Sequence, residues 1–333
     1  MSDQDEYMQN LKEDAKREAE NRSAYERERI LSYDKLRYTF SPWTVDAYYN
    51  DLLSRSSVTY HPQKSPSKTM ARKDAQIGVV QWIKSRFNPD KKKEVDKVIQ
   101  KSQDRLQQET DEFNKREYER CQRANKRVQN EIDEKLRLFL NGDSDEVSRY
   151  FTFVVDSDDY SLDNQQRYEF SFCLEYDYQS KRILIDYRMP RSYDISDIKG
   201  WRLTKDYDVE PKRMSKKDFL QQYEKILFDL VVRTVSLIFE SDDRDVVSEV
   251  LFNASTVYDE APDRIIFFIS AIIPKKNYIR QDIRNYGFVS KRFISQMKQA
   301  RYLGDLHNDD PPSILADRPP MKLVIPIRTM LQG

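Results

Sequence analysis

The stretch from Asp90 to Leu140 contains neither proline nor glycine. At 1.5 Å per residue, an unbroken helix over these roughly fifty residues would reach on the order of 75 Å, far more than a helix inside a compact domain needs. Apolar side chains recur along it at spacings of three, four and their multiples, which is typical of a coiled-coil seam. The seam consists of Val95, Val98, Ile99, Leu106, Phe113, Cys121, Ala124, Val128, Ile132, Leu136 and Phe139, and it is interrupted by Ser102, Thr110 and Glu117. Such a helix needs a partner, either the charged N-terminal helix of the same chain, up to about Leu36, or a second copy.

The patterns on either side of this helix divide the chain into three segments: a charged helical N-terminal region (1–89), the long helix or coiled-coil arm (90–141) and a folded domain (142–333). Residues up to about Leu36 are almost all charged or polar, which predicts a solvated or partner-dependent helix. After Pro42, apolar residues at helical spacing predict a short packed helix. The run from Met70 to Phe87 predicts another helix, which ends before Asn88-Pro89.

Strand-like alternation is expected after Asn141-Gly142-Asp143, which ends the long helix. Between Tyr168 and Asp177 apolar residues alternate with polar ones, and the return run from Arg182 to Pro190 alternates in the same way. This regularity predicts an antiparallel hairpin with one buried face. On that face we expect Tyr168, Phe170, Phe172, Leu174 and Tyr176 from the first strand, and Ile183, Ile185, Tyr187 and Met189 from the second.

The run Ser215-Lys-Lys-Asp218 has the form of a helix N-cap, and the helix that it begins is apolar nearly all round as far as about Glu240. Such a helix is expected to be buried. Two further strands are predicted near Val247 to Tyr258 and near Arg264 to Ile273. The expected fold class is therefore α+β, with a long N-terminal helical or coiled-coil arm followed by an antiparallel sheet packed on a central buried helix.

The composition excludes several classes of function. Lys plus Arg and Asp plus Glu both number 57 in the 333 residues, so any attraction to nucleic acid must come from a local patch. The six glycines are never closer than seventeen residues, which rules out a phosphate-binding loop, and two cysteines cannot form a four-ligand zinc site. No apolar run approaches the roughly 20 residues that span a bilayer, and the N-terminus has no signal-peptide pattern. We expect a cytoplasmic protein with no cofactor, no bound metal and no membrane partner.

Asp177 and the run Asp186-Tyr187-Arg188 imitate the carboxylate spacing with which some nucleases hold Mg²⁺ on a hairpin. Arginine, however, stands where those nucleases have lysine, and Asp177 falls in the predicted turn. Outward-facing acids opposite basic residues such as Arg182 are more often cross-strand pairs on a solvated face. We therefore interpret the hairpin as a scaffold whose acids face water, and we assign no catalytic residue. A metal-dependent nuclease that uses Asp177 and Asp186 is the alternative.

The most uneven charge in the chain lies between Pro274 and Arg301, where eight positive residues face one acid and four aromatic residues are interleaved with them. Cations that neutralise phosphates beside rings that stack on bases predict a nucleic-acid surface. The alternative is a pair of amphipathic helices whose aromatic residues pack on the sheet and whose basic residues are solvated. The candidate nucleic-acid-binding residues are Lys275, Lys276, Arg280, Arg284, Lys291, Arg292, Lys298 and Arg301.

Four stretches carry a family resemblance: NGDSDEVSRYFTFVV, FCLEYDYQSKRILIDYRMP, KDYDVEPKRMSKKDFLQQYEKILFDLVVRTVSLIFESDD and VSEVLFNASTVYD. Together, from about Asn141 to Tyr278, they resemble the region that precedes the nuclease domain in bacterial Mrr-type restriction endonuclease proteins. The resemblance implies a module of DNA-restriction and phage-defence proteins. Because the chain ends at Gly333, where that family's catalytic domain is expected to begin, it also implies a module without the part that cuts.

These observations lead to one functional hypothesis. The chain is expected to be a non-catalytic component of a bacterial restriction-like, anti-phage defence system. It would recognise DNA or dock an effector protein encoded nearby, through its α+β domain and its helical arm. Oligomerisation, with a second copy or with another protein, is expected through the long helix. Two rival hypotheses stay open: the metal-dependent nuclease, and a coiled-coil scaffold with no role in nucleic-acid binding.

Overall fold

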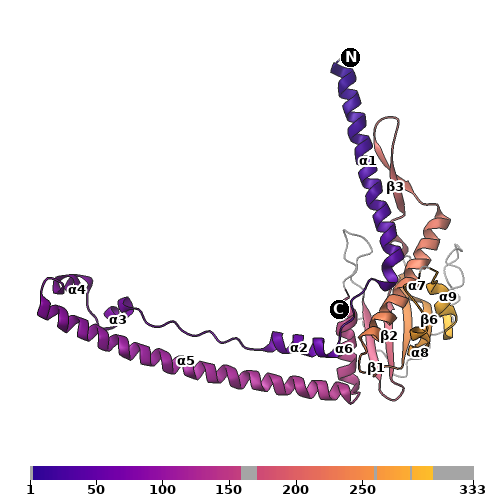
Figure 1. Cartoon of the computed structure of the whole chain (residues 1–333). Coiled ribbons are helices and arrows are strands. Elements are labelled where there is room, and N and C mark those ends of the chain that lie inside the picture. The colour runs from indigo at the N-terminus through magenta and orange to yellow at the C-terminus, as the bar shows by residue number, and fades with distance from the viewer. Residues whose placement is uncertain (1–2, 159–170, 259–260, 286, 303–333) are drawn as a thin grey trace. The chain divides into compact units, whose positions relative to one another are not determined.

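A computed structural model describes residues 3–158, 171–258, 261–285 and 287–302 of the chain (Figure 1). Contacts between residues divide the chain into two units, and each is described by itself. The sheet unit comprises the described residues up to Tyr48 and from Arg137 onward, and the arm unit comprises residues 49–136. The expected α+β class is confirmed. The charged N-terminal region is shared between the two units, because its first 48 residues group with the sheet.

The helices and strands have the following bounds. The helices are α1 (Asp3–Lys35), α2 (Val45–Ser56), α3 (Lys68–Asp74), α4 (Val79–Ser85), α5 (Pro89–Leu140), α6 (Ser144–Asp156), α7 (Lys216–Ser241), α8 (Lys275–Ile279) and α9 (Ser290–Ser295), with the short 3-10 helices η1 (Leu36–Tyr38) and η2 (Ser192–Asp194). The strands are β1 (Phe172–Asp177), β2 (Arg182–Arg188), β3 (Ile198–Leu203), β4 (Val209–Arg213), β5 (Glu249–Tyr258), β6 (Ala261–Pro274) and β7 (Lys298–Tyr302). None of the described helices is both long enough and apolar enough to cross a bilayer.

Strands β1, β2, β5, β6 and β7 form one sheet in that spatial order, and β3 pairs with β4 in a separate hairpin. The predicted hairpin is confirmed, since β1 and β2 are antiparallel with Phe172 opposite Tyr187. Tyr168 and Phe170, which were predicted for the same strand, lie outside the described residues. Strands β2 and β5 run parallel, so the sheet is mixed and the expectation of a wholly antiparallel sheet is wrong. The reason is the connection between them, in which the β3–β4 hairpin and α7 form a long crossover.

Helix α7 packs against the sheet at the centre of this unit (Figure 1). Ser215 begins it as predicted, because its hydroxyl accepts a hydrogen bond from the amide of Asp218 at 3.1 Å. Every residue from Ile226 to Phe239 is buried, so the predicted burial all round the helix is confirmed. The register of the strands places a set of buried apolar side chains on one face of the sheet: Leu174, Tyr176, Ile183, Ile185, Tyr187, Val250, Phe252, Ala254, Ile269, Ala271 and Ile273.

Helix α6 corrects the expectation that strands begin directly after Gly142. Asp143 caps this helix by accepting a hydrogen bond from the amide of Glu146 at 3.0 Å. Gly142 has a φ of 75°, which lets the chain turn sharply between α5 and α6. The buried side chains of α6 recur at helical spacing, although their aromatic and β-branched character resembles a strand. They are Val147, Tyr150, Phe151, Val154 and Val155.

Helix α1 is solvated over its first half only. Residues 6–18 are exposed apart from the half-buried Ala15, whereas Ala19, Glu26 and Arg29 are buried where the helix packs on β3. The hydroxyl of Ser23 accepts a hydrogen bond from the amide of Trp201 at 2.8 Å and donates one to its carbonyl oxygen at 3.1 Å. The first half of α1 is therefore solvated, whereas the second half packs on a partner, the strand β3 of the same chain.

The arm unit contains the predicted long helix, since α5 runs unbroken over Pro89–Leu140. The single helix predicted for residues 70–87 is instead two short ones, α3 and α4, separated where Gln76 has a φ of 55° and Gly78 begins α4. Ala71 and Ile77 from this region form a buried cluster with Ile99 of the seam, and Leu106 packs against it. Part of the seam is thus covered by residues 49–88, a partner beyond the two that the sequence suggested, while Val98 and Phe113 stay exposed.

Candidate functional site

Three of the candidate basic residues whose side chains are described make ion pairs, and those of Lys275 and Lys291 are short. Lys275 Nζ lies 2.7 Å from Asp242 Oδ2 and 2.9 Å from Asp245 Oδ1, and Lys291 Nζ lies 2.7 Å from Glu224 Oε1. Burial lowers the pKa of Lys275, but its hydrogen bonds to the two aspartates outweigh this effect, so the pKa is raised overall. These two positive charges therefore serve contacts inside the sheet unit.

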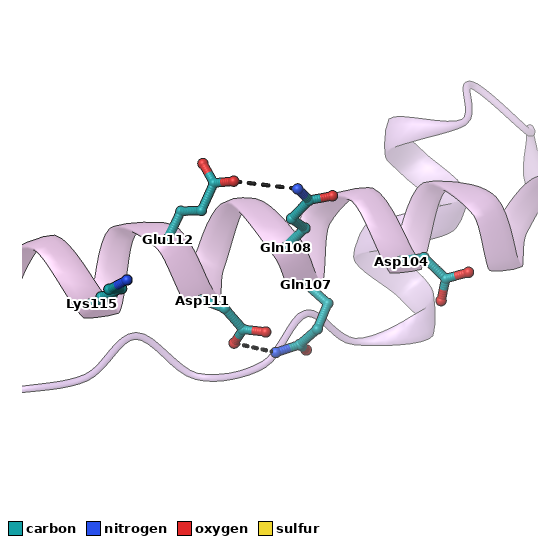
Figure 2. Close-up of a pocket in the computed structure, with 6 residues that line it drawn as sticks. All are labelled: Asp104, Gln107, Gln108, Asp111, Glu112 and Lys115. Atoms are coloured by element: carbon teal, nitrogen blue, oxygen red, sulfur yellow. Dashed lines mark hydrogen bonds between the residues drawn. The ribbon is translucent and has the colours of Figure 1, made fainter.

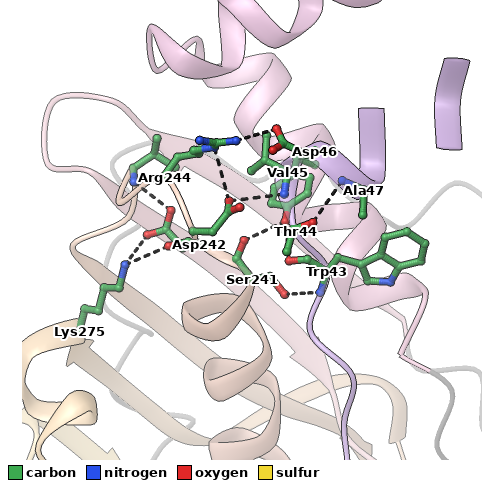
Figure 3. Close-up of polar contacts among 12 residues, drawn as sticks. Trp43, Thr44, Val45, Asp46, Ala47, Ser241, Asp242, Arg244 and Lys275 are labelled. Carbon is green, nitrogen blue, oxygen red and sulfur yellow. Dashed lines mark hydrogen bonds and ion pairs between the residues drawn. The ribbon is translucent and has the colours of Figure 1, made fainter. Parts of the chain in front are cut away.

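Lys275 belongs to a polar cluster at the C-terminal end of α7 (Figure 3). The carboxylate of Asp242 also accepts hydrogen bonds from two backbone amides at 2.9 and 3.0 Å, which holds the turn that precedes β5. Arg244 Nη2 lies 2.6 Å from Asp46 Oδ1 and ties the start of α2 to the same turn. The cluster fastens three segments to the end of α7, so its charges have a structural use.

The aromatic residues between the basic ones are turned into the protein. Tyr278 and Phe293 are buried, and the Tyr278 hydroxyl donates a hydrogen bond to Glu240 Oε1 at 2.7 Å. The ring of Phe288 packs on that of Phe293, with centroids 5.6 Å apart. Tyr286 lies outside the described residues. This packing favours the alternative of amphipathic helices over rings that are free to stack on bases.

Three candidate cations stay free for an external partner. Lys276, Arg280 and Arg292 are exposed and have no ion-pair partner within the described part of the chain. Arg284 is exposed as well and lies 3.8 Å from Glu240. Lys298 and Arg301 lie in β7, and their side chains fall outside what the structure describes. The eight residues therefore form a much smaller free positive surface than their number indicates.

Asp177 holds the turn between β1 and β2, where the sequence places it. Its Oδ1 accepts a hydrogen bond from the amide of Gln179 at 3.0 Å, and its Oδ2 accepts one from the hydroxyl of Ser180 at 2.6 Å. Asp177 stands opposite Arg182, and Asp186 is four residues further along β2, a separation of roughly 13 Å at about 3.3 Å per residue. Because Mg²⁺ needs its ligand oxygens at about 2.1 Å, these two carboxylates do not share one ion. Among the described residues, no group of three or more His, Cys, Asp or Glu is placed to hold a metal.

Asp186 belongs to a polar row that crosses three strands of the sheet. Asn253 Nδ2 donates a hydrogen bond to Asp186 Oδ1 at 2.8 Å, and Ser270 Oγ donates one to Asn253 Oδ1 at 2.5 Å. Asn253 and Ser270 are buried, and Asp186 is half-buried. The expectation that both hairpin acids face water is therefore wrong for Asp186. The row fixes the orientation of its carboxyl group, but a neutral amide in the middle cannot relay a proton.

Burial raises the pKa of the Asp186 carboxyl, and the hydrogen bond from Asn253 offsets part of this effect. Burial also raises the pKa of the neighbouring Cys173 thiol, as do the charges of Glu175 and Asp186. A thiol of raised pKa is a weak nucleophile, so the row is not arranged for covalent chemistry.

The arm unit carries two asparagine clamps, which fix an extended segment on α5. Asn114 Oδ1 accepts a hydrogen bond from the Gln63 amide at 2.8 Å, and its Nδ2 donates to the Gln63 carbonyl at 3.1 Å. Asn125 holds Val58 in the same way at 2.7 and 3.1 Å. Asn114 and Asn125 are eleven residues apart on α5, a distance of about 16 Å along the helix axis. Val58 and Gln63 are five residues apart, which is also about 16 Å in an extended chain. One extended segment therefore reaches both clamps.

Part of α5 presents a polar face in which amide and carboxylate side chains pair along the helix (Figure 2). Gln107 Nε2 donates a hydrogen bond to Asp111 Oδ1 at 2.8 Å, and Gln108 Nε2 donates one to Glu112 Oε1 at 3.3 Å. With Asp104 and Lys115 these side chains line an open depression of about 410 Å³. Such a shallow polar face suits contact with another protein better than it suits capture of a small ligand.

Sequence reasoning missed both the clamps and the polar row. A signal for the clamps was present, because asparagine is a poor helix former and Asn114 and Asn125 lie about three turns apart on one side of α5. No signal for the polar row was available, because it depends on which strand lies beside β2. The chain matches no protein-family model, no curated protein and no solved structure.

Proposed function

We propose that the chain is a non-catalytic docking component of a bacterial restriction-like, anti-phage defence system. Its arm unit docks an effector protein encoded nearby, and its sheet unit contributes a small basic surface to DNA recognition. The defence setting comes from the resemblance to the Mrr-type proteins alone. The docking role rests on the geometry of the arm unit.

The observation that carries the docking role is the covered seam of α5. Because residues 49–88 cover part of this seam and two asparagine clamps fix them, the arm unit is a preformed surface. A preformed surface binds without the cost of ordering a flexible chain. Val98 and Phe113 belong to the same seam but keep their apolar side chains exposed, so a partner can bury them.

Co-expression with each neighbouring reading frame, followed by mass measurement of the purified complex, tests the docking role. We expect a complex with the wild-type chain and at least about tenfold weaker association with the Val98→Asp, Phe113→Asp variant, because a buried carboxylate opposes an apolar contact. The matched control is Gln122→Asp, Asn130→Asp, which adds the same charge at two exposed polar positions of α5. Equal loss in both variants would assign the effect to charge alone and contradict the proposal.

The DNA role rests on Lys276, Arg280 and Arg292, the candidate cations that have no ion-pair partner among the described residues. Their replacement by glutamate should weaken binding to a short DNA duplex at least about tenfold at low salt and reduce its salt dependence. The control variant Lys205→Glu, Lys212→Glu, Lys217→Glu reverses three exposed charges elsewhere in the sheet unit. Fluorescence anisotropy measures both. Failure of the wild-type chain to bind, or equal weakening by the control, would favour the scaffold with no nucleic-acid role.

The metal-dependent nuclease is the rival class, and the separation of Asp177 and Asp186 along the sheet counts against it. The wild-type chain is expected to leave duplex DNA and RNA intact in Mg²⁺. Robust cleavage that disappears in the Asp177→Asn, Asp186→Asn variant would overturn the proposal.

A further inference from the structure

The first half of α1 exposes large apolar side chains in the part of the chain that the structure describes. Tyr7, Met8 and Leu11 are exposed on it, and Ala15 continues the same side one turn further on. Positions separated by one, four and eight residues fall on one side of a helix. A helical segment of this length that lacks tertiary packing is only marginally stable in water. This half of α1 therefore gains stability from any partner that covers the stripe.

A second uncovered stripe lies at the end of the arm unit where α4 leads into α5 (Figure 1). Val79, Val80, Ile83 and Phe87 are exposed there, Val80 at 65% and Phe87 at 86%. Trp82 of the same helix packs inward on the buried cluster. The spacing of this stripe is the same as that of Tyr7, Met8, Leu11 and Ala15 in α1. The large apolar side chains of both stripes are thus exposed in the described part of the chain, although Phe87 lies in the turn that follows α4.

The charges around the two stripes are opposite. From Lys84 to Lys93 five positive residues accompany a single acid, whereas from Asp3 to Glu20 seven acids accompany three positive residues. Lys84, Lys91, Lys92 and Lys93 have no ion-pair partner among the described residues, and the same is true of Glu6 and Glu13 in α1. Three lysines near the N-terminus of α5 also reinforce the positive end of the helix dipole, which is unfavourable unless a negative group lies nearby.

We propose that these two surfaces bind each other between copies of the chain. The acidic first half of α1 of one copy docks on the basic α4 end of the arm unit of another copy. The apolar stripes pack together and the unpaired charges neutralise each other. Because every copy carries both surfaces, the contact is heterologous and builds either closed rings or open chains. The contact uses neither Val98 nor Phe113, so it does not rest on the docking of an effector.

A second copy of the chain can cover both surfaces, whereas a nucleic acid or a membrane cannot. A nucleic acid would neutralise the lysines but leave the aliphatic side chains of α4 uncovered. An anionic membrane surface would cover the α4 stripe, but its charge would repel the acidic half of α1. Only a partner that is both acidic and apolar fits the α4 end, and the chain itself supplies one.

Sedimentation and light scattering on the full chain test the proposal. The mass should rise with protein concentration in about 50 mM salt, and the apparent dissociation constant should increase at least about tenfold in about 500 mM salt. Two charge variants separate the two surfaces: Lys91→Glu, Lys92→Glu, Lys93→Glu for the arm, and Glu6→Lys, Glu13→Lys for α1. Each variant alone should stay monomeric. An equimolar mixture should assemble again, because each reversed surface then meets a surface of opposite charge.

The control variant Lys115→Glu, Lys126→Glu, Arg127→Glu reverses three exposed charges elsewhere on α5 and should assemble like the wild type. Ile83→Asp, Phe87→Asp removes the apolar half of the contact and should also prevent assembly. A single-chain mass for the wild type at about 100 µM in low salt would overturn the proposal, and so would a mixture of the two charge variants that stays monomeric. Because Val98→Asp, Phe113→Asp should leave self-assembly intact, the outcome is independent of effector docking.

Discussion

The sheet unit and the arm unit use their charged residues in opposite ways. In the sheet unit, Arg233 is buried with 1% of its side chain exposed, and it contacts both carboxylate oxygens of Asp158 at 2.7 Å. In the arm unit, every Lys and Arg except Arg72 and Lys135 is exposed, and neutral asparagine side chains make the clamps that hold it together. The comparison teaches that the sheet unit buries charge inside its fold, whereas the arm unit keeps most of its charge at the surface.

The two units differ in the same way in their apolar cores. The sheet unit buries α7 on all sides and one full face of the sheet. The buried apolar residues of the arm unit are few among the described residues: Tyr49, Ala71, Ile77, Ile99 and Ile132. A segment with few buried apolar contacts opens at a lower free energy than a well-packed core. Substitutions in the sheet unit should therefore unfold it as a whole, whereas substitutions in the arm unit should open it locally.

The largest effect is expected from Arg233→Ala. This change removes the guanidinium that pairs with the Asp158 carboxylate and removes a hydrogen bond to the Leu36 carbonyl at 2.8 Å. Loss of one partner of a buried pair costs about 3–5 kcal/mol of unfolding free energy. Urea unfolding followed by circular dichroism measures it.

The control for Arg233 is Arg202→Ala, which removes an exposed contact with Glu210 at 3.2 Å and should cost less than about 1 kcal/mol. If the two variants lose similar free energy, the contrast between buried and exposed charge in this molecule is wrong.

A smaller and local effect is expected from Asn114→Ala, Asn125→Ala. The double variant releases the clamped segment, and each lost pair of hydrogen bonds should cost about 1–2 kcal/mol. Hydrogen exchange should show faster exchange at the amides of Val58 and Gln63, while protection in α7 stays unchanged. Asn130→Ala, at an exposed position of α5, is the control. Loss of protection in α7 would mean that the clamps stabilise more than the arm unit.

Local patterns predicted the elements whose causes are local. The cap at Ser215, the burial of α7, the continuity of α5 and the β1–β2 hairpin depend on residues within a few positions of each other. Helix α6 was missed because Tyr150, Phe151 and Val154 each favour strands as residue types. The N-cap at Asp143 stabilises a helix there instead. The parallel pairing of β2 with β5 depends on a crossover of about sixty residues, which no local pattern encodes.

The candidate sites show the same limit. A charge count over Pro274–Arg301 does not reveal that Lys275 reaches Asp242 or that Lys291 reaches Glu224, since those partners lie far away in the sequence. The seam of α5 was identified, but its covering segment contains Pro62 and Pro66 and has no helical periodicity. Such a segment is recognised only once Asn114 and Asn125 are seen to bind its backbone.

The smallest expected effect concerns Asp186. Its negative charge is expected to lower the stability of the sheet unit, whereas the ion pair of Arg233 stabilises it. Burial raises the pKa of this carboxyl above its usual 3.8, so the folded protein binds the proton more tightly than the unfolded chain does. The free energy of unfolding therefore falls as the pH rises from 3.8 through the raised pKa, and the ionised carboxylate is a net cost at neutral pH. Asp186→Asn keeps an oxygen to accept the hydrogen bond from Asn253 and removes the charge.

Asp186→Asn should consequently increase the free energy of unfolding at pH 7 by up to about 1 kcal/mol and leave it nearly unchanged at pH 3. Urea unfolding across this pH range measures the difference, with Asp206→Asn at an exposed position as the control. A variant that is less stable than the wild type at pH 7 would mean that the carboxylate is stabilised by the polar row. The charge of Asp186 would then stabilise the sheet unit, as the charge of Arg233 does. The difference between buried, stabilising charges in the sheet unit and exposed charges in the arm unit would be larger than the raised pKa of Asp186 indicates.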